Sequence, residues 1–226
     1  MRRTERARTA VRLTAPRSTV SNHSRPISRG FQGRRTDPED RHRVPPGQYV
    51  TRDFPVLSAG PTPHVSLVEW TFSMRVGDRP LGKWNWAEFQ DLTQTRAAVD
   101  IHCVTKWSKL DTVWEGVTID ALLKAAGLDA APTPYALAHS DGGYSTNVPT
   151  KDLAGKAMIA TRFADAPLSA AHGGPARLLV PHLYFWKSAK WVRSIEFITA
   201  DRPGFWESLG YHIYGDPWHE QRYSGD

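Results

Sequence analysis

With 226 residues, the chain is long enough to build a sizeable hydrophobic core, and its single cysteine excludes any disulfide within the chain. It contains no run of 18 apolar residues, so we expect no membrane-spanning helix and a cytoplasmic location. The net charge of +6 is unevenly distributed, because residues 1–35 carry ten arginines and one glutamate, a balance of +9, which leaves −3 for the remainder.

The basic N-terminal segment, residues 1–35, is rich in Arg, Ser and Thr and has few large apolar side chains. We therefore predict a disordered tail, followed by one folded domain over residues 36–226. The segment begins Met1-Arg2-Arg3, as a twin-arginine signal can, but it has no apolar stretch after these residues, so no export signal is predicted. A basic arm can contact nucleic acid or anionic lipid, but this one lacks interleaved aromatic residues, so nucleic acid is not the expected partner.

The first part of the predicted domain combines extended segments with a short helix. Residues 41–64 contain five prolines, which disfavours helix and central strand and favours an extended segment across the surface. A strand is predicted over Val65–Val76, with a turn at Gly77-Asp78. A helix is predicted to begin after Asn85, whose side chain can cap it while the side chain of Glu88 reaches back.

The middle of the chain holds the only cysteine. Ala97–Cys103 is a short, mostly apolar run that predicts a strand, so we expect the thiol where a strand leaves the core and a loop begins. Trp114–Val117 predicts a turn into a second helix, which Thr118 caps and Gly127 ends. The apolar face of that helix is predicted to consist of Ile119, Leu122, Leu123 and Ala126.

The last third of the chain alternates strands with long loops. The predicted strands are Tyr135–His139, Ala157–Phe163, Arg177–Val180 and Trp191–Thr199. The predicted turns are Ser140–Gly143 and a segment that Thr150 caps and Gly155 ends, and a short helix is predicted over Phe205–Leu209. We expect the aromatic segment 211–223 to pack back onto the domain. Because strands and helices do not alternate strictly, the predicted fold class is α+β, and loops this long are typical of a binding site.

The residues alone leave several interpretations of Cys103 open. A single cysteine is most often a small buried apolar side chain. It could also be a nucleophile paired with His102, His139, His172 or His182, although a neighbour such as His102 is expected on the opposite face of the strand. One cysteine without an HExxH motif does not favour zinc, and the chain contains no Walker A or GxGxxG phosphate loop.

A second informative stretch is His172-Gly173-Gly174-Pro175-Ala176-Arg177, followed by Ser188-Ala189-Lys190. The two glycines allow a bulky ligand to approach the backbone, and Arg177 and Lys190 are both suited to phosphate. A lone thiol and a separate basic loop would suit an anionic cofactor held by cations at one end and by sulfur at the other. The other interpretation is that Arg177 and Lys190 are ordinary charged residues at strand ends, and composition alone favours it.

An ordered set of motifs carries a family resemblance. The motifs are Pro45-Pro46-Gly47, Phe54-Pro55-Val56-Leu57, Asp100–Ser108, Trp114–Val117, Asp141–Asn147, His172–Arg177, Lys187–Trp191 and Gly215-Asp216-Pro217-Trp218. On these motifs the chain resembles the sulfite oxidase-type molybdenum enzymes, in particular the short bacterial sulfite oxidase-like proteins that consist of the molybdopterin-binding domain alone. The resemblance implies a mixed-sheet α+β domain whose long loops surround a molybdenum–molybdopterin cofactor.

The same resemblance implies roles for individual residues. The cofactor-binding residues that it implies are Cys103, Ser140, His172, Arg177, Ser188, Ala189 and Lys190. Cys103 looks like the thiolate ligand of molybdenum, a metal that soft sulfur suits. His172 and Arg177 resemble the pair that holds the pterin and its phosphate, with Lys190 on the phosphate side. The extended segment Phe54–His64 is expected to cover the pterin.

The activity implied is oxygen-atom transfer to or from a small molecule at molybdenum. Because a haem domain is not expected in this chain, the electron carrier is expected to be separate: a cytochrome, a flavin or a quinone-linked carrier. The arginine cluster that binds sulfite in this family is not evident around Cys103, where Lys106 is the candidate catalytic cation. Sulfite oxidation and reduction of an S-oxide or N-oxide are therefore both open. The alternative function is a non-catalytic pterin- or nucleic-acid-binding module of the same fold.

Overall fold

The computed structural model describes residues 38–226. The predicted basic tail, residues 1–35, and the first two residues of the predicted domain lie outside the described part. Within that part, no helix combines the length and the apolar character that crossing a membrane would require.

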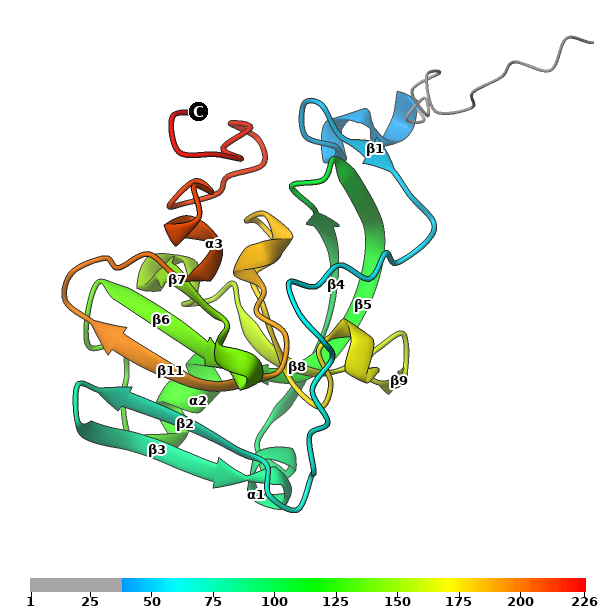
Figure 1. Ribbon diagram of the computed structural model, residues 1–226. Coiled ribbons are helices and arrows are strands. Elements are labelled where there is room, and N and C mark those ends of the chain that lie inside the picture. The colour runs from blue at the N-terminus through cyan, green and yellow to red at the C-terminus, as the bar shows by residue number, and fades with distance from the viewer. Residues whose placement is uncertain (1–37) are drawn as a thin grey trace, which may run out of the picture. The chain divides into compact units, whose positions relative to one another are not determined.

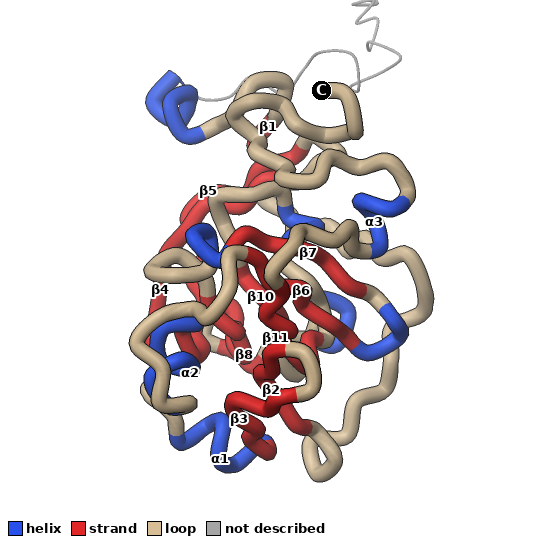
Figure 2. Tube along the Cα trace, turned by 90° about the vertical axis from the view of Figure 1, so that its left-hand side faces the viewer, coloured by secondary structure: helices blue, strands red, loops and turns tan. Residues whose placement is uncertain are grey.

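Two mixed β-sheets form the framework of the domain (Figures 1 and 2). The first sheet contains β1 (Tyr49–Val50), β4 (Gln94–His102), β5 (Trp107–Thr118), β8 (Met158–Phe163), β9 (Ala166–Pro167) and β10 (Arg177–Leu179). The second sheet runs in the order β3 (Arg79–Asn85), β2 (Thr71–Val76), β11 (Val192–Ile198), β6 (Tyr135–Ser140) and β7 (Ser145–Pro149). Only the β1–β5 and β2–β11 pairs are parallel among the described strands. This arrangement confirms the predicted α+β class.

Three short α-helices and several 3₁₀ turns connect the strands. The helices are α1 (Trp86–Asp91), α2 (Ile119–Ala125) and α3 (Phe205–Ser208). The 3₁₀ turns are η1 (Pro38–Arg43), η2 (Asp141–Gly143), η3 (Thr150–Asp152), η4 (Ala170–His172) and η5 (Phe185–Lys187). Both predicted helix caps are confirmed: Asn85 and Glu88 form a reciprocal capping box, and the Thr118 hydroxyl accepts from the backbone N–H of Ala121.

The apolar side chains form two clusters. The larger cluster joins the second sheet to α1 and α2 and includes the fully buried Trp70, Phe72 and Leu122. The smaller cluster lies on the first sheet and includes Trp114 and Cys103. Burying one large apolar side chain contributes about 1.5–3 kcal/mol to the free energy of unfolding. The two clusters therefore stabilise the strands from whose ends the loops emerge.

The prediction of a turn over Trp114–Val117 is wrong, because these residues lie inside the long strand β5. Gly116 suggested a turn, but its role is close packing: a Cβ atom there would lie 2.1 Å from the carbonyl oxygen of Ile159 on β8. The missing side chain thus permits two strands to approach, a use of glycine that sequence does not distinguish from a turn.

Other boundaries also differ from the predictions. The strand expected from Val65 begins only at Thr71. Strands β3 and β7 were not predicted, because β3 contains a proline and a glycine and β7 is short and mostly polar. Thr150 does not cap its turn; its hydroxyl donates instead to the carbonyl oxygen of Thr133 at 2.7 Å.

The C-terminal segment packs back onto the domain, as expected. Tyr211 pairs with Tyr223, and the backbone N–H of Tyr184 donates to the carbonyl oxygen of Gly215 at 2.8 Å. Trp218 and Tyr223 nevertheless remain about half exposed, so their burial was overestimated.

Candidate cofactor and active site

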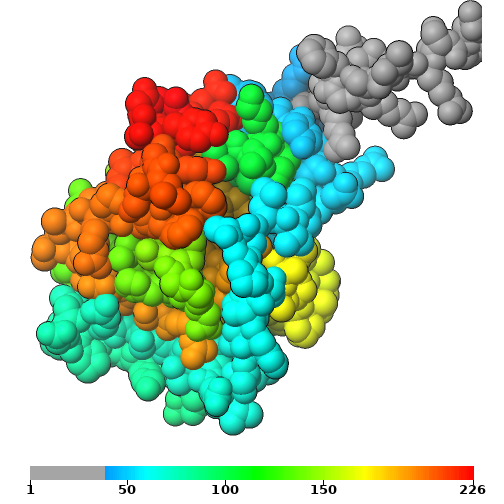
Figure 3. All heavy atoms as spheres, in the orientation of Figure 1, coloured from blue at the N-terminus to red at the C-terminus, as the bar shows by residue number. Residues whose placement is uncertain are grey.

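A cavity of about 580 Å³ opens where the loops of both sheets meet. One of its sides is the strap, which we define as residues 52–64; in Figure 3 this cyan segment runs down the face shown. The main lining residues outside the strap are Cys103, Val104, Thr105, Trp107, Asp141, Tyr144, His172, Arg177, Phe185, Trp186, Ser188, Ala189, Lys190, Trp191, Phe205, Trp206 and Tyr211. The volume suits a cofactor together with a small substrate.

Cys103 begins the tight turn between β4 and β5, as the sequence predicted. Its backbone N–H donates to the carbonyl oxygen of Trp107 at 2.8 Å, and its carbonyl oxygen accepts from Lys106 N–H at 3.0 Å and from Gln48 Nε2 at 3.1 Å. The Thr105 hydroxyl donates to Cys103 Sγ at 3.2 Å. Burial raises the pKa of the thiol, so the cysteine is a neutral thiol until a metal replaces its proton.

Arg177 is the only arginine among the lining residues, and it is 2% exposed. Its guanidinium donates to the carbonyl oxygens of His172 at 2.7 Å and of Ser188 at 2.8 and 3.2 Å, and it lies 3.9 Å from the centre of the Phe185 ring. No ion pair joins it to a carboxylate in the described part of the chain. Burial lowers its pKa to about 9. A buried cation without an anionic partner is costly, and a bound anion would offset that cost.

Lys190 and His172 attach the strap to the cationic side of the cavity. Lys190 Nζ donates to the carbonyl oxygens of Leu57 and Ala171, each at 2.7 Å, and His172 Nε2 lies 3.0 Å from the carbonyl oxygen of Phe54. His172 Nε2 therefore carries the proton and donates. The pKa of Lys190 is lowered to about 8, first by burial and then by Arg177, and burial also lowers the pKa of His172.

The glycine-rich segment explains how these cations come together. Gly173 has φ +109°, and a Cβ atom on it would lie 2.9 Å from the Cα atom of Lys190. Glycine therefore allows the segment before β10 to touch the Ser188–Lys190 loop. In that loop, Ser188 Oγ accepts from the backbone N–H of Val180 at 2.9 Å, which fixes the loop against the end of β10.

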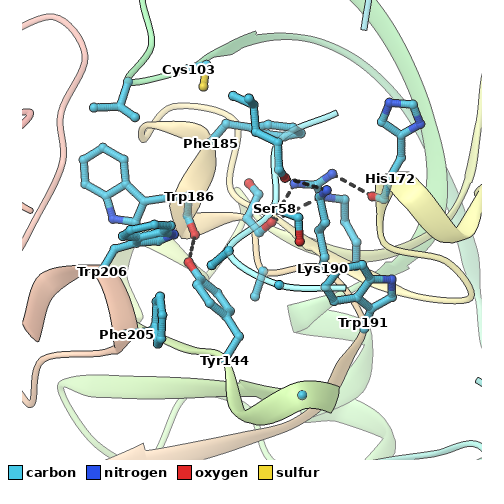
Figure 4. A pocket seen from close by; sticks show the side chains of 18 of the residues that line it. Ser58, Cys103, Tyr144, His172, Phe185, Trp186, Lys190, Trp191, Phe205 and Trp206 are labelled. Carbon is cyan, nitrogen blue, oxygen red and sulfur yellow. Dashed lines mark hydrogen bonds between the residues drawn. The ribbon is translucent and has the colours of Figure 1, made fainter. Parts of the chain in front are cut away.

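The opposite side of the cavity is aromatic, and sequence reasoning did not find it. We call Trp186, Phe205, Trp206 and Tyr211 the aromatic wall; in Figure 4 its three labelled members lie across the cavity from Lys190 and Trp191. Tyr144 lies beside Phe205, with ring centres 5.8 Å apart, and its hydroxyl donates to the carbonyl oxygen of Trp186 at 2.6 Å. The nine tryptophans were the one available signal, but composition does not say which of them meet.

The cavity gathers most of the predicted site residues. Cys103, His172, Arg177, Ser188, Ala189 and Lys190 all line it. Ser140 does not, although the next two residues of its turn do. Lys106 is exposed and does not line the cavity, so its predicted catalytic role has no support from its position.

The histidines do not form a nucleophile pair with Cys103. All four candidates contact other groups. His102 Nδ1 lies 2.9 Å from Ser108 Oγ, His139 is hydrogen-bonded to Glu196, and His182 is hydrogen-bonded to Asp152. His172 is bonded to Ser169 and to the strap. Across residues 38–226, no group of three or more His, Cys, Asp or Glu residues is placed to hold a metal ion. A thiol hydrolase and a protein-only zinc site are therefore not supported.

The residues fit an anionic cofactor that carries a soft metal. An unpaired buried guanidinium and an ammonium group lie on one side of the cavity, and a thiol able to ligate a soft metal lines the same cavity. The α+β fold and this donor set together define a protein suited to hold an anionic, thiol-ligated cofactor in this cavity.

Comparison with known proteins identifies the family. Residues 59–206 match the family described as oxidoreductase molybdopterin binding domain. "Uncharacterized oxidoreductase YuiH" of Bacillus subtilis is 40% identical over 199 residues, which cover 87% of this chain and 100% of that protein. "Putative protein-methionine-sulfoxide reductase subunit YedZ1" of Azospira oryzae is 26% identical over 188 residues, 81% of this chain and 71% of that protein.

A solved structure shares the fold. The sulfane dehydrogenase SoxCD from Paracoccus pantotrophus superposes with a TM-score of 0.54 at 17% identity, over 62% of this chain and 40% of that chain. The present chain thus spans less than half of that longer protein, and the likeness concerns the fold. The chain belongs to the oxidoreductase molybdopterin-binding domain family, which confirms the predicted family and, with it, molybdenum–molybdopterin as the cofactor.

Proposed function

We propose that this oxidoreductase binds molybdenum through Cys103 and transfers an oxygen atom between the metal and a small-molecule donor or acceptor. The observation that carries the proposal is the placement of the only cysteine in one cavity with a buried, unpaired Arg177. A pterin cofactor of this kind carries a metal, which a thiolate can ligate, and a phosphate, which a separate cation can bind.

Each protein group has a distinct task in this proposal. Arg177 and Lys190 would neutralise and orient the cofactor phosphate. His172 holds the strap, with its ring stacked 3.9 Å from the Phe54 ring, and would help to hold the pterin. Cys103 would ligate the metal as a thiolate, and the Thr105 hydroxyl, which donates to Cys103 Sγ, would stabilise that thiolate. The bound cofactor supplies two-electron oxygen-atom exchange, while the protein binds, orients and tunes it.

The aromatic wall favours a neutral S-oxide or N-oxide over sulfite as the substrate. Among the lining residues, the only basic side chains are His172, Arg177 and Lys190, and each of them already donates to a backbone carbonyl. A dianion such as sulfite would meet the aromatic faces of the wall, which itself carries no positive charge. The name of the second relative, a methionine-sulfoxide reductase subunit, agrees with an S-oxide.

A separate electron carrier completes the proposed reaction. Reduction of an S-oxide consumes two electrons and two protons and releases the reduced sulfur compound and water. Across residues 38–226, no group of three or more His, Cys, Asp or Glu residues is placed to hold a second metal centre. We therefore propose a cytochrome, a flavin or a quinone-linked carrier as the partner, consistent with a relative that is named as a subunit.

The proposal is tested by metal and pterin analysis of protein from a molybdenum-replete host. We expect about one molybdenum per chain and release of the pterin on denaturation. C103S should stay folded but lose turnover and change the metal spectrum, and R177M should lose cofactor. The matched control is R162M, because Arg162 lies on β8 of the same sheet, pairs with Glu115 and does not line the cavity.

The alternative, a non-catalytic module, predicts different results. A pterin-binding module would retain pterin but show no turnover with any oxo donor or acceptor, and C103S would leave its ligand affinity unchanged. If neither molybdenum nor pterin accompanies protein from a host that loads related enzymes, the proposed function is wrong.

A further inference from the structure

A buried ion pair is hydrogen-bonded to the aromatic wall. Lys187 Nζ is 2.6 Å from Glu207 Oε1, and their side chains are 0% and 1% exposed. The same carboxylate oxygen accepts from Trp186 Nε1 and from Thr146 Oγ1, each at 2.9 Å. Three donors from two separate segments therefore converge on one oxygen of α3.

The pair joins the segments that carry the wall. Lys187 follows Trp186 on η5, and Glu207 follows Trp206 on α3, so each partner is adjacent in sequence to a wall residue. Lys187 Nζ also donates to the carbonyl oxygen of Ile213 at 2.7 Å, two residues beyond Tyr211. The network thus fixes η5, α3 and the start of the C-terminal segment relative to one another.

Stability alone does not explain this pair. Removing two charges from water costs several kcal/mol per ion, and apolar residues of the same volume often stabilise a protein as well or better. Moreover, Glu207 Oε2 has no hydrogen-bond partner among the described residues, although it is buried. The pair instead fixes geometry. A carboxylate oxygen that accepts from three donors holds α3 in one position relative to them.

We propose that Glu207 is a positioning residue that fixes the aromatic wall and so sets the width of the passage to Cys103. The wall then selects substrates by size and shape at the reacting end of the cavity. The effect on substrate selection rests on the proposed function, whereas the effect on the passage does not.

The passage is measured on the metal-free full-length chain by alkylation of Cys103. Because Cys103 is the only cysteine, a mass shift reports this thiol alone. The rate with a bulky aromatic maleimide is divided by the rate with iodoacetamide, which cancels any change in the thiolate fraction. E207Q, which keeps the volume and removes the charge, should raise this ratio about tenfold.

The matched control is E196Q. Glu196 is also a largely buried carboxylate with several donors, namely Arg75, Arg202 and His139, but it lies on β11 and does not line the cavity. E196Q should destabilise the chain without changing the alkylation ratio. An unchanged ratio in E207Q, or an equal change in E196Q, would overturn the proposal.

A milder variant covers the case in which E207Q does not fold. T146V removes one hydrogen bond to Glu207 and keeps the volume of a fully buried side chain, so it should shift the ratio in the same direction by about threefold. No shift in folded T146V, with E207Q unfolded, would reduce Glu207 to a purely structural residue.

The cofactor-loaded enzyme gives an independent measurement. E207Q should raise KM for a dialkyl sulfoxide about tenfold while kcat changes less than threefold, because the wall contacts the substrate and not the metal. If the chain loads no molybdenum, the proposed function fails, but the alkylation ratio still decides the role of Glu207.

Discussion

Two residues beside Cys103 differ in what they can do to a bound metal. Lys106 is exposed at the turn, whereas the Thr105 hydroxyl donates to Cys103 Sγ at 3.2 Å. A hydrogen bond withdraws electron density from a ligating sulfur and raises the reduction potential of its metal. We therefore expect T105V to shift the potential to a lower value in a redox titration, while T105S keeps it. K106A should change neither the potential nor kcat, and a large loss of kcat in K106A would restore Lys106 as a catalytic candidate.

Lys190 should leave a signature in the pH dependence of stability. Its folded pKa is about 8, below the 10.5 of the unfolded chain, so the unfolded state binds more protons between these values. The free energy of unfolding should therefore rise with pH from about 8 to 10.5 through this group. Below pH 8 the buried lysine is charged, and this contribution to stability is lost. K190M should lack that part of the rise. The measurement is urea unfolding of metal-free wild-type and K190M protein across this range, and identical slopes would contradict the assignment.

At the scale of elements, Gly116 allows β5 and β8 to pair closely. A Cβ atom would lie 2.1 Å from the Ile159 oxygen and 2.6 Å from the Ala160 Cα atom, so G116A must separate the strands. We expect a loss of about 1–3 kcal/mol in the free energy of unfolding, measured by denaturant titration. The control is G60A, because a Cβ atom on Gly60 would meet no other atom within 4 Å and the residue has no positive φ. Equal effects of the two substitutions would show that strand spacing is not what matters.

The elements that sequence predicted well are those whose signals are local. The capping box at Asn85 and the cap at Thr118 depend on residues three apart, and both are present. The strand before Cys103 was recognisable from its apolar run. Strands β3 and β7 depend on their neighbours in the second sheet, and the turn expected at Gly116 depended on a glycine whose purpose is contact with β8. Such tertiary contacts override local preference.

The same distinction applies to the site. His172, Arg177 and Lys190 could be chosen because they lie in contiguous motifs that carry the family resemblance. The aromatic wall could not, because Trp186 and Tyr211 meet only through packing of distant segments, with ring centres 5.1 Å apart. Lys106 was chosen for its proximity in sequence to Cys103, but its side chain is exposed and outside the cavity, so its catalytic role stays a prediction without support from its position.

At the scale of the whole molecule, the domain is built around a charge that it does not neutralise itself. In the metal-free chain, R177M removes three hydrogen bonds, worth about 1 kcal/mol each, but also a buried unpaired cation that costs several kcal/mol. The second effect is the larger, so metal-free R177M should be as stable as metal-free wild type or more so.

Cofactor binding should stabilise wild type strongly and R177M little, because only wild type pairs its cation with the bound anion. Denaturant titrations of both proteins with and without cofactor check this reversal. If R177M instead loses more than about 2 kcal/mol without cofactor, Arg177 is a structural residue and the domain is not preorganised for an anion.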